Sequence, residues 1–251
     1  NVMEQTKPTF PTEEVTLPSK GLLYPEDSPL SKGFIEMKYM TAREEDILTN
    51  QNLIENGTVI DKLLQALITT PIDYNELLIG DKNAILIAAR ILGYGEEYIF
   101  TYKDEDINVN LTEINDKPLD ESLVTKGKNH FYFTLPTSKV EVTFKLLTHA
   151  DERSIDKELK GLKKLNKSMS PILSTRMKYI ITSIKGDSEK KTIREFVDTQ
   201  LLARDSRALR NYISDLQPGV DLNIEAEDKN GDLQTVPISI GANFFWPDAG
   251  I

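Results

Sequence analysis

Residues 34–48 read Phe-Ile-Glu-Met-Lys-Tyr-Met-Thr-Ala-Arg-Glu-Glu-Asp-Ile-Leu, and two patterns of different period meet in this stretch. Up to Met40 the side chains alternate, which predicts a strand over residues 34–40. Thr41 and Glu44 then have the spacing of a capping box, in which each side chain accepts a hydrogen bond from the other residue's backbone amide. A helix is therefore expected from Thr41 to about Asn50. A strand that passes directly into a helix predicts a mixed fold.

The same signals continue on both sides of this stretch. Helices are expected at about 41–93 and 151–216, and β structure is expected at 34–40, 97–147 and 220–241. Within the first helical part, Asp81 is expected to cap a third helix that stops at Gly93. Residues 131–135 and 140–146 are expected to form a hairpin, and Lys229-Asn-Gly-Asp232 predicts a second one. The predicted class is α+β, with helical segments flanking a small, mainly antiparallel β region.

The second helical part also begins with a capping signal, at Thr148 and Asp151. Its most apolar helical face is expected to consist of Ile172, Leu173, Met177, Ile180, Ile181 and Ile184. The predicted organisation is an extended N-terminal arm, a strand with helices, a β-rich region, a basic helical bundle, and a C-terminal hairpin with an aromatic tail. These segments span residues 1–33, 34–96, 97–147, 148–217 and 218–251.

Composition excludes several kinds of chemistry. The 251 residues contain no cysteine and two histidines, so thiol catalysis, disulfides and histidine-rich zinc sites are excluded. Catalysis by His149 with Asp151 is a weak alternative, because capping already explains Asp151. No nucleophile, phosphate-binding or calcium-loop motif occurs. The sequence therefore predicts a protein that is not an enzyme, with no catalytic residues, no cofactor, no metal and no small-molecule substrate.

Charge is unevenly distributed along the chain. The net charge is −10, yet residues 151–217 contain 15 basic and 10 acidic residues. Two interpretations are open, a surface that contacts an acidic neighbour or a solvated surface of internal ion pairs. No apolar run reaches the length that spans a bilayer, so no membrane partner is expected.

Two groups of residues are candidates for partner binding. Arg204, Arg207 and Arg210 are spaced along one helix face, where they are expected to pair with Asp198, Asp205 and Asp215 or to bind a protein partner. Phe244, Phe245 and Trp246 either fill the protein's own core or anchor a partner. The proline-rich segment 1–33 is either draped over its own domain or lent to a partner. We therefore hypothesise that a neighbouring subunit orders at least one end of the chain.

Three stretches of the sequence resemble the baseplate hub and hub-assembly proteins of T-even-type contractile-tailed phages. They are Leu17-Pro-Ser-Lys-Gly-Leu-Leu-Tyr-Pro25, Ile35–Leu48 and Asn243-Phe-Phe-Trp-Pro247. Several similar proteins carry a Cys-x-x-Cys-Gly knuckle in the terminal hairpin, where this chain has Glu227-Asp-Lys-Asn-Gly231. A metal held by that knuckle in relatives is therefore not expected here.

The resemblance implies a structural or assembly component of the baseplate hub. Its partners would be other tail baseplate or hub proteins. It would be assembled in the host cytoplasm and located in the virion tail baseplate. Two alternatives stay open: a tail-assembly chaperone that is absent from the virion, or a nucleic-acid-binding protein that uses the basic helical segment. Nucleic acid is the weaker of the two, because the acidic chain as a whole repels it.

Overall fold

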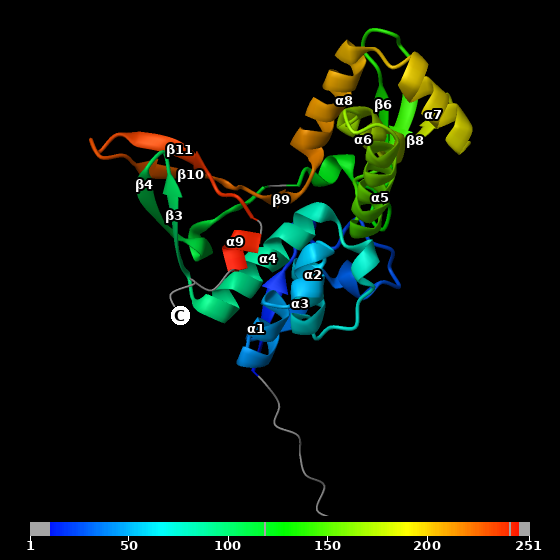
Figure 1. The fold of residues 1–251 in the computed structure, drawn as a ribbon. Helices are drawn as coiled ribbons and strands as arrows, with labels where there is room; N and C mark the ends of the chain where they lie inside the picture. Colours follow the sequence, from blue (N-terminus) through cyan, green and yellow to red (C-terminus); the bar gives the residue numbers. More distant parts are fainter. Residues whose placement is uncertain (1–10, 118, 241, 246–251) are drawn as a thin grey trace, which may run out of the picture.

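The computed structural model describes residues 11–117, 119–240 and 242–245, and it confirms the α+β class. Figure 1 shows three groups of elements. Helices α1–α4 lie beside the N-terminal segment, two β-hairpins project to one side, and a small sheet with α5–α8 projects to the other. Each sheet is small and antiparallel, with at most three strands. One connected hydrophobic core runs through the described residues.

The described part of the N-terminal segment is draped over its own domain. Strand β1 (Thr12–Thr16) pairs antiparallel with β2 (Phe34–Lys38), and the short helix η1 (Pro29–Lys32) lies between them. Leu17, Leu23, Tyr24 and Leu30 are buried in the core. Of the two interpretations of the arm, residues 11–33 therefore follow the one in which the arm is draped over its own domain. Residues 1–10 lie outside the described residues.

The first helical group follows the predicted pattern, with two corrections. It comprises α1 (Ala42–Leu48), α2 (Gln51–Glu55), α3 (Val59–Leu67), η2 (Tyr74–Glu76) and α4 (Ile79–Tyr94). The capping box of Thr41 and Glu44 is present. Asp81 does not cap α4, because that helix already begins at Ile79. The helix also continues past Gly93 to a cap at Gly95, whose φ of 90° suits glycine.

Asp81 is buried instead of capping a helix. Its carboxylate accepts hydrogen bonds from the Ser19 amide (2.9 Å), the Ser19 hydroxyl (2.6 Å) and the Tyr24 hydroxyl (2.6 Å). Burial raises the pKa of this carboxyl group, although these hydrogen bonds act in the opposite direction. The group therefore ties the N-terminal segment to α4.

The two hairpins that project together come from distant parts of the sequence (Figure 1). Strands β3 (Glu97–Tyr102) and β4 (Glu105–Asn110) form the first, and β10 (Asn223–Glu227) and β11 (Leu233–Pro237) form the second, with the predicted turn at 229–232. The short helices η3 (Leu111–Glu113) and η4 (Glu121–Leu123) follow β4, and α9 (Ala242–Phe245) follows the second hairpin. A further short strand pair involves β5 (Asp116–Lys117), which follows the first hairpin in sequence, and β9 (Gly219–Val220), which precedes the second.

The remaining group is a three-stranded sheet with four helices. Strand β6 (Phe131–Thr134) pairs with β7 (Glu141–Phe144) as the predicted hairpin, and β7 also pairs with β8 (Ile181–Ile184). The helices are α5 (His149–Leu165), α6 (Ile172–Ile180), α7 (Lys190–Thr199) and α8 (Ala203–Leu216).

The expected apolar helix face over 172–184 is wrong in its second half. Helix α6 ends at Ile180, and Ile181–Ile184 form strand β8. β-Branched residues at 180–182 favour extended backbone, and the second edge of β7 offers them hydrogen-bond partners. The expected face is also exposed at Ile172 and Leu173.

Candidate functional site

The three candidate arginines lie on the exposed face of α8. Arg204, Arg207 and Arg210 are all exposed, and none of them forms an ion pair with another described residue. Asp198 pairs with Lys178 instead, at 2.8 Å. The expected pairing with Asp198, Asp205 and Asp215 is therefore wrong, because the aspartates are used elsewhere or face solvent.

Asp205 is buried on the opposite side of α8 from these arginines. Its carboxylate accepts hydrogen bonds from the Thr137 amide (2.7 Å) and the Ser138 amide (3.0 Å). Burial raises the pKa of this carboxyl group, but the hydrogen bonds from the two amides outweigh it, so the pKa lies below its usual range. Asp205 therefore fixes α8 to the β6–β7 turn and leaves the arginine face pointing away from the core.

The C-terminal aromatic residues are partly core elements. Phe244 and Phe245 are 2% and 1% exposed. The Phe244 ring lies 4.8 Å from the Tyr98 ring and 5.4 Å from the Phe245 ring, measured between centroids, and both contacts are edge-on. These two rings thus pack into the chain's own core between α9 and β3. Trp246 lies outside the described residues.

A buried polar cluster joins the first helical group to α5. The Asp61 carboxylate accepts hydrogen bonds from Lys82 Nζ (2.6 Å) and from the Tyr74 hydroxyl (2.7 Å). His149 Nδ1 lies 3.2 Å from Lys82 Nζ. Burial and the positive charge of Lys82 lower the pKa of His149 below its usual range, which disfavours the charged form of its ring.

Sequence reasoning missed this cluster because its members are far apart in the chain. The sequence feature that could have pointed to the cluster was His149 at the start of α5. Each of these polar groups is engaged within the cluster. The cluster therefore acts as a structural connection between helices.

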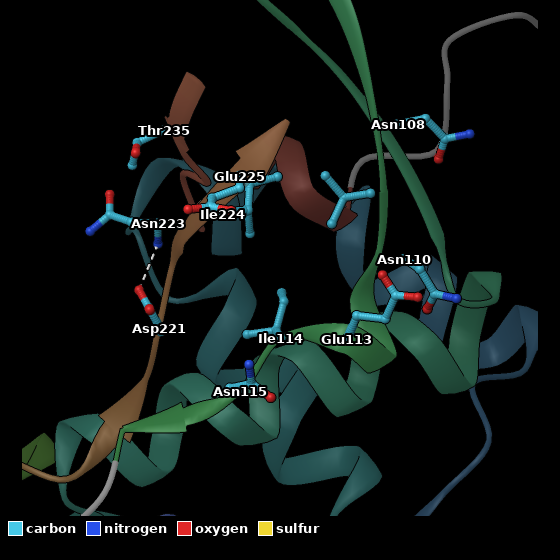
Figure 2. A pocket seen from close by; sticks show the side chains of 11 residues that line it. Asn108, Asn110, Glu113, Ile114, Asn115, Asp221, Asn223, Ile224, Glu225 and Thr235 are labelled. Atoms are coloured by element: carbon cyan, nitrogen blue, oxygen red, sulfur yellow. Dashed lines mark hydrogen bonds between the residues drawn. The ribbon is translucent and has the colours of Figure 1, made fainter. Parts of the chain in front are cut away.

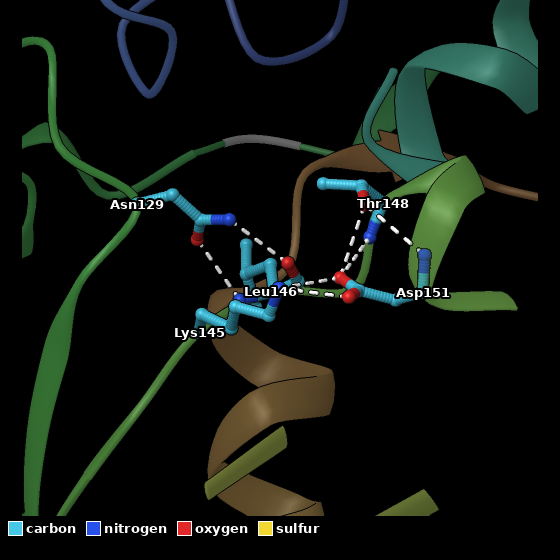
Figure 3. A network of polar contacts seen from close by, with 5 residues as sticks. All are labelled: Asn129, Lys145, Leu146, Thr148 and Asp151. Carbon is cyan, nitrogen blue, oxygen red and sulfur yellow. Dashed lines mark hydrogen bonds and ion pairs between the residues drawn. The ribbon is translucent and has the colours of Figure 1, made fainter. Parts of the chain in front are cut away.

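A second polar network holds the segment that follows β7 against the start of α5 (Figure 3). Thr148 and Asp151 form the predicted capping box, and Lys145 Nζ pairs with Asp151 at 2.7 Å. The Asn129 side chain donates to the Leu146 carbonyl at 2.8 Å and accepts from the Leu146 amide at 2.9 Å. Asp151 is thus fully occupied by capping and by Lys145, as a structural role requires.

A protein-family model described as "T4 bacteriophage base plate protein" matches residues 12–246. The chain belongs to this baseplate family. All helices and strands of the described structure fall inside the matched range. No curated protein and no solved structure matches the chain. As a member of the T4-type baseplate family, the protein is a structural component of the phage tail baseplate, where it contacts other baseplate proteins.

One pocket of this baseplate protein is an open polar groove of about 570 Å³. Figure 2 shows that its walls come from β4 and η3 on one side and from β10 and β11 on the other. Amide and carboxylate side chains dominate, and they belong to Asn108, Asn110, Glu113, Asn115, Asp221, Asn223 and Glu225. No group of three or more His, Asp or Glu side chains in the described residues has the geometry of a metal site.

The groove contains no histidine, and no lysine or arginine lines it. The titratable side chains that line it are the carboxylates of Glu113, Asp221 and Glu225. Across the described residues, no helix combines the length and the apolar character that crossing a membrane requires.

Proposed function

We propose that the protein is a structural or assembly component of the baseplate hub and acts through contacts with other hub or baseplate proteins. The match to the baseplate family over residues 12–246 carries this proposal. The resemblance of residues 17–25, 35–48 and 243–247 to hub proteins supports the hub as the location within the baseplate. Assembly takes place in the host cytoplasm before the tail is complete.

Two features support a non-enzymatic role. The titratable side chains buried in the described core, such as Asp81 and His149, are engaged by neighbouring protein groups. Each therefore stabilises the fold in the way expected of a buried polar group. The large groove is polar and open, and offers hydrogen-bonding groups without an activated nucleophile. No cofactor or small-molecule substrate enters the proposal.

Helix α8 supplies a candidate contact surface. Arg204, Arg207 and Arg210 extend into solvent from a helix that Asp205 holds in place. Guanidinium groups bind carboxylates bidentately, and arginine is enriched among residues that dominate binding energy. The three side chains therefore suit an acidic surface on a neighbouring subunit.

The location is tested by quantifying the protein in purified particles. Virions, isolated baseplates and infected-cell extracts are compared by quantitative mass spectrometry, with the protein carrying an N-terminal affinity tag. A hub component is present in baseplates at a fixed ratio to the other hub proteins. A tail-assembly chaperone is present only in extracts and in incomplete particles. Absence from every particle and every assembly intermediate contradicts the proposal.

The nucleic-acid alternative has its own measurement. Binding to a 30-base-pair duplex is measured at 50 mM and 200 mM salt by fluorescence anisotropy. Binding through phosphate contacts weakens steeply over this range. We expect no binding at 200 mM salt, because the net charge of −10 repels the duplex. Binding that persists at 200 mM salt and is lost on substituting the α8 arginines favours the nucleic-acid function instead.

A further inference from the structure

Exposed apolar side chains concentrate at the turn that joins α5 to α6. We call residues 165–173 the α5–α6 turn. Of the eleven large apolar side chains that are exposed among the described residues, four belong to these nine residues. They are Leu165 (85% exposed), Met169 (44%), Ile172 (50%) and Leu173 (55%). Isolated exposed apolar residues are ordinary on protein surfaces, whereas such a concentration is typical of an interaction site.

The turn has a defined conformation. The Asn166 amide donates to the Leu162 carbonyl at 3.0 Å, and the Met169 amide donates to the Asn166 carbonyl at 3.0 Å. The Asn166 side chain accepts from the Ser168 amide (3.1 Å) and hydroxyl (2.7 Å). Because hydrogen bonds already order the backbone, a partner that covers the four apolar side chains meets a small entropic cost.

Positive charge surrounds the turn. Residues 159–186 contain seven basic residues and no acidic residue, in a chain whose net charge is −10. Arg176 pairs with Glu152 at 2.9 Å and Lys178 pairs with Asp198 at 2.8 Å. Four lysines next to the turn are exposed and form no ion pair within the described part of the chain, namely Lys160, Lys163, Lys164 and Lys167.

We propose that the α5–α6 turn docks into an apolar groove with an acidic rim on a neighbouring baseplate subunit. This inference rests on the proposed function and specifies the surface that makes the contact. The apolar side chains would fill the groove, while the surrounding lysines would face carboxylates at its edge. The partner is therefore defined by two properties together, an apolar floor and a negative rim.

Other occupants fit these two properties less well. Nucleic acid matches the lysines but offers its charged backbone to four apolar side chains. An anionic bilayer would accept both the apolar side chains and the lysines. The turn, however, has no tryptophan or tyrosine, the residues that are enriched at membrane interfaces. A second copy of the chain offers acidic residues, yet its large groove is lined mainly by amides and carboxylates.

Two pairs of substitutions separate the apolar and the charged parts of the contact. Leu165→Ser with Leu173→Ser removes apolar area, and Lys163→Glu with Lys164→Glu reverses charge. The matched controls are Ile99→Ser with Leu233→Ser, which are 61% and 68% exposed on the two hairpins, and Lys190→Glu with Lys191→Glu on α7. All eight positions are exposed, so thermal unfolding of each variant is expected to match the wild type.

Incorporation is measured by complementing a phage that lacks the gene with each variant and quantifying the protein in purified baseplate intermediates. We expect both turn variants to lower incorporation by at least about tenfold, and both control pairs to leave it unchanged. Normal incorporation of the turn variants, with wild-type protein present in the particles, overturns the docking surface and leaves the proposed function intact. Absence of wild-type protein from every particle and assembly intermediate overturns the proposed function itself.

The class of partner is identified with a photo-crosslinking amino acid at position 165, with position 99 as the control. A crosslink from 165 to an acidic segment of another baseplate protein supports the proposal. Crosslinks mainly to a second copy of the chain overturn it. Binding of the purified wild-type protein to phosphatidylserine vesicles, if it is lost in the variant with serine at 165 and 173, also overturns it. Binding to a DNA duplex that is lost in the same variant overturns it as well.

Discussion

Gly80 and Pro218 approach so closely that no side chain fits between them. A Cβ atom on Gly80 would lie 1.8 Å from the Pro218 carbonyl oxygen. Gly80 belongs to the first turn of α4, and Pro218 directly precedes β9, which connects α8 to the C-terminal hairpin. This contact therefore fixes where the second half of the chain returns to the first helical group.

Gly80→Ala is expected to lower the free energy of unfolding by about 3 kcal/mol, because the backbone of residue 218 must move away. Gly161→Ala is the matched control within a helix. No atom lies within 4 Å of a Cβ at that position, so alanine should raise stability by up to about 1 kcal/mol through its helix propensity. Urea denaturation of the two variants measures both changes. If Gly80→Ala leaves the free energy of unfolding unchanged, the contact between residues 80 and 218 is not tight in solution.

Glu44 makes stability depend on pH. Burial raises its pKa, but the hydrogen bonds from Lys38 (2.5 Å) and the Thr41 amide (2.9 Å) outweigh this and lower the pKa from 4.5 to about 2. A carboxyl group with a lowered folded pKa stabilises the protein above its unfolded pKa. That contribution is therefore complete above about pH 4.5 and is lost as the pH falls towards 2.

Glu44→Gln should accordingly cost about 1–2 kcal/mol at pH 7, a value reduced for the partial exposure of Lys38. The difference between wild type and variant should shrink when unfolding is measured at pH 3. Glu55→Gln is the control, since Glu55 is exposed and forms no ion pair with a described residue. A difference that is constant from pH 7 to pH 3 would assign the effect of Glu44→Gln to packing instead of charge.

Asp205→Ala should destabilise the group of elements around α8 by about 1–3 kcal/mol. The substitution leaves the amides of Thr137 and Ser138 without their acceptor in a part-buried position. Hydrogen exchange should therefore increase at residues 135–140 and along α8. Asp215→Ala, at an exposed position of the same helix, should change neither measurement. Equal effects of the two substitutions would rule out this special role for Asp205.

The α8 arginines should affect binding without affecting stability. Changing Arg204, Arg207 and Arg210 together to glutamine is expected to shift the free energy of unfolding by less than about 0.5 kcal/mol, because all three are exposed. If they contact a baseplate subunit, the variant enters baseplate intermediates less efficiently than the wild type. Sedimentation of intermediates from infected cells measures this. If the triple variant enters baseplate intermediates as efficiently as the wild type, the arginine face is not a required contact.

The sequence by itself determined those features that depend on residues a few positions apart. The capping boxes at 41–44 and 148–151, the hairpin turn at 229–232 and the β6–β7 hairpin occur where the local patterns predict them. Their hydrogen bonds close within one turn or one hairpin, so the local order of residues is sufficient. The α+β class follows from the alternation of these local patterns.

Tertiary structure decided the features that depend on which distant segment lies alongside. Asp81 is a buried acceptor because Ser19 and Tyr24 pack on it from about sixty residues away, and residues 181–184 are a strand because β7 offers its free edge. Phe244 and Phe245 became core residues because Tyr98 and its neighbours cover them. The exposure of the α8 arginines was decided in the same way, by Asp205 and the turn that it binds. Burial is a property of neighbours in space, and local sequence patterns do not contain it.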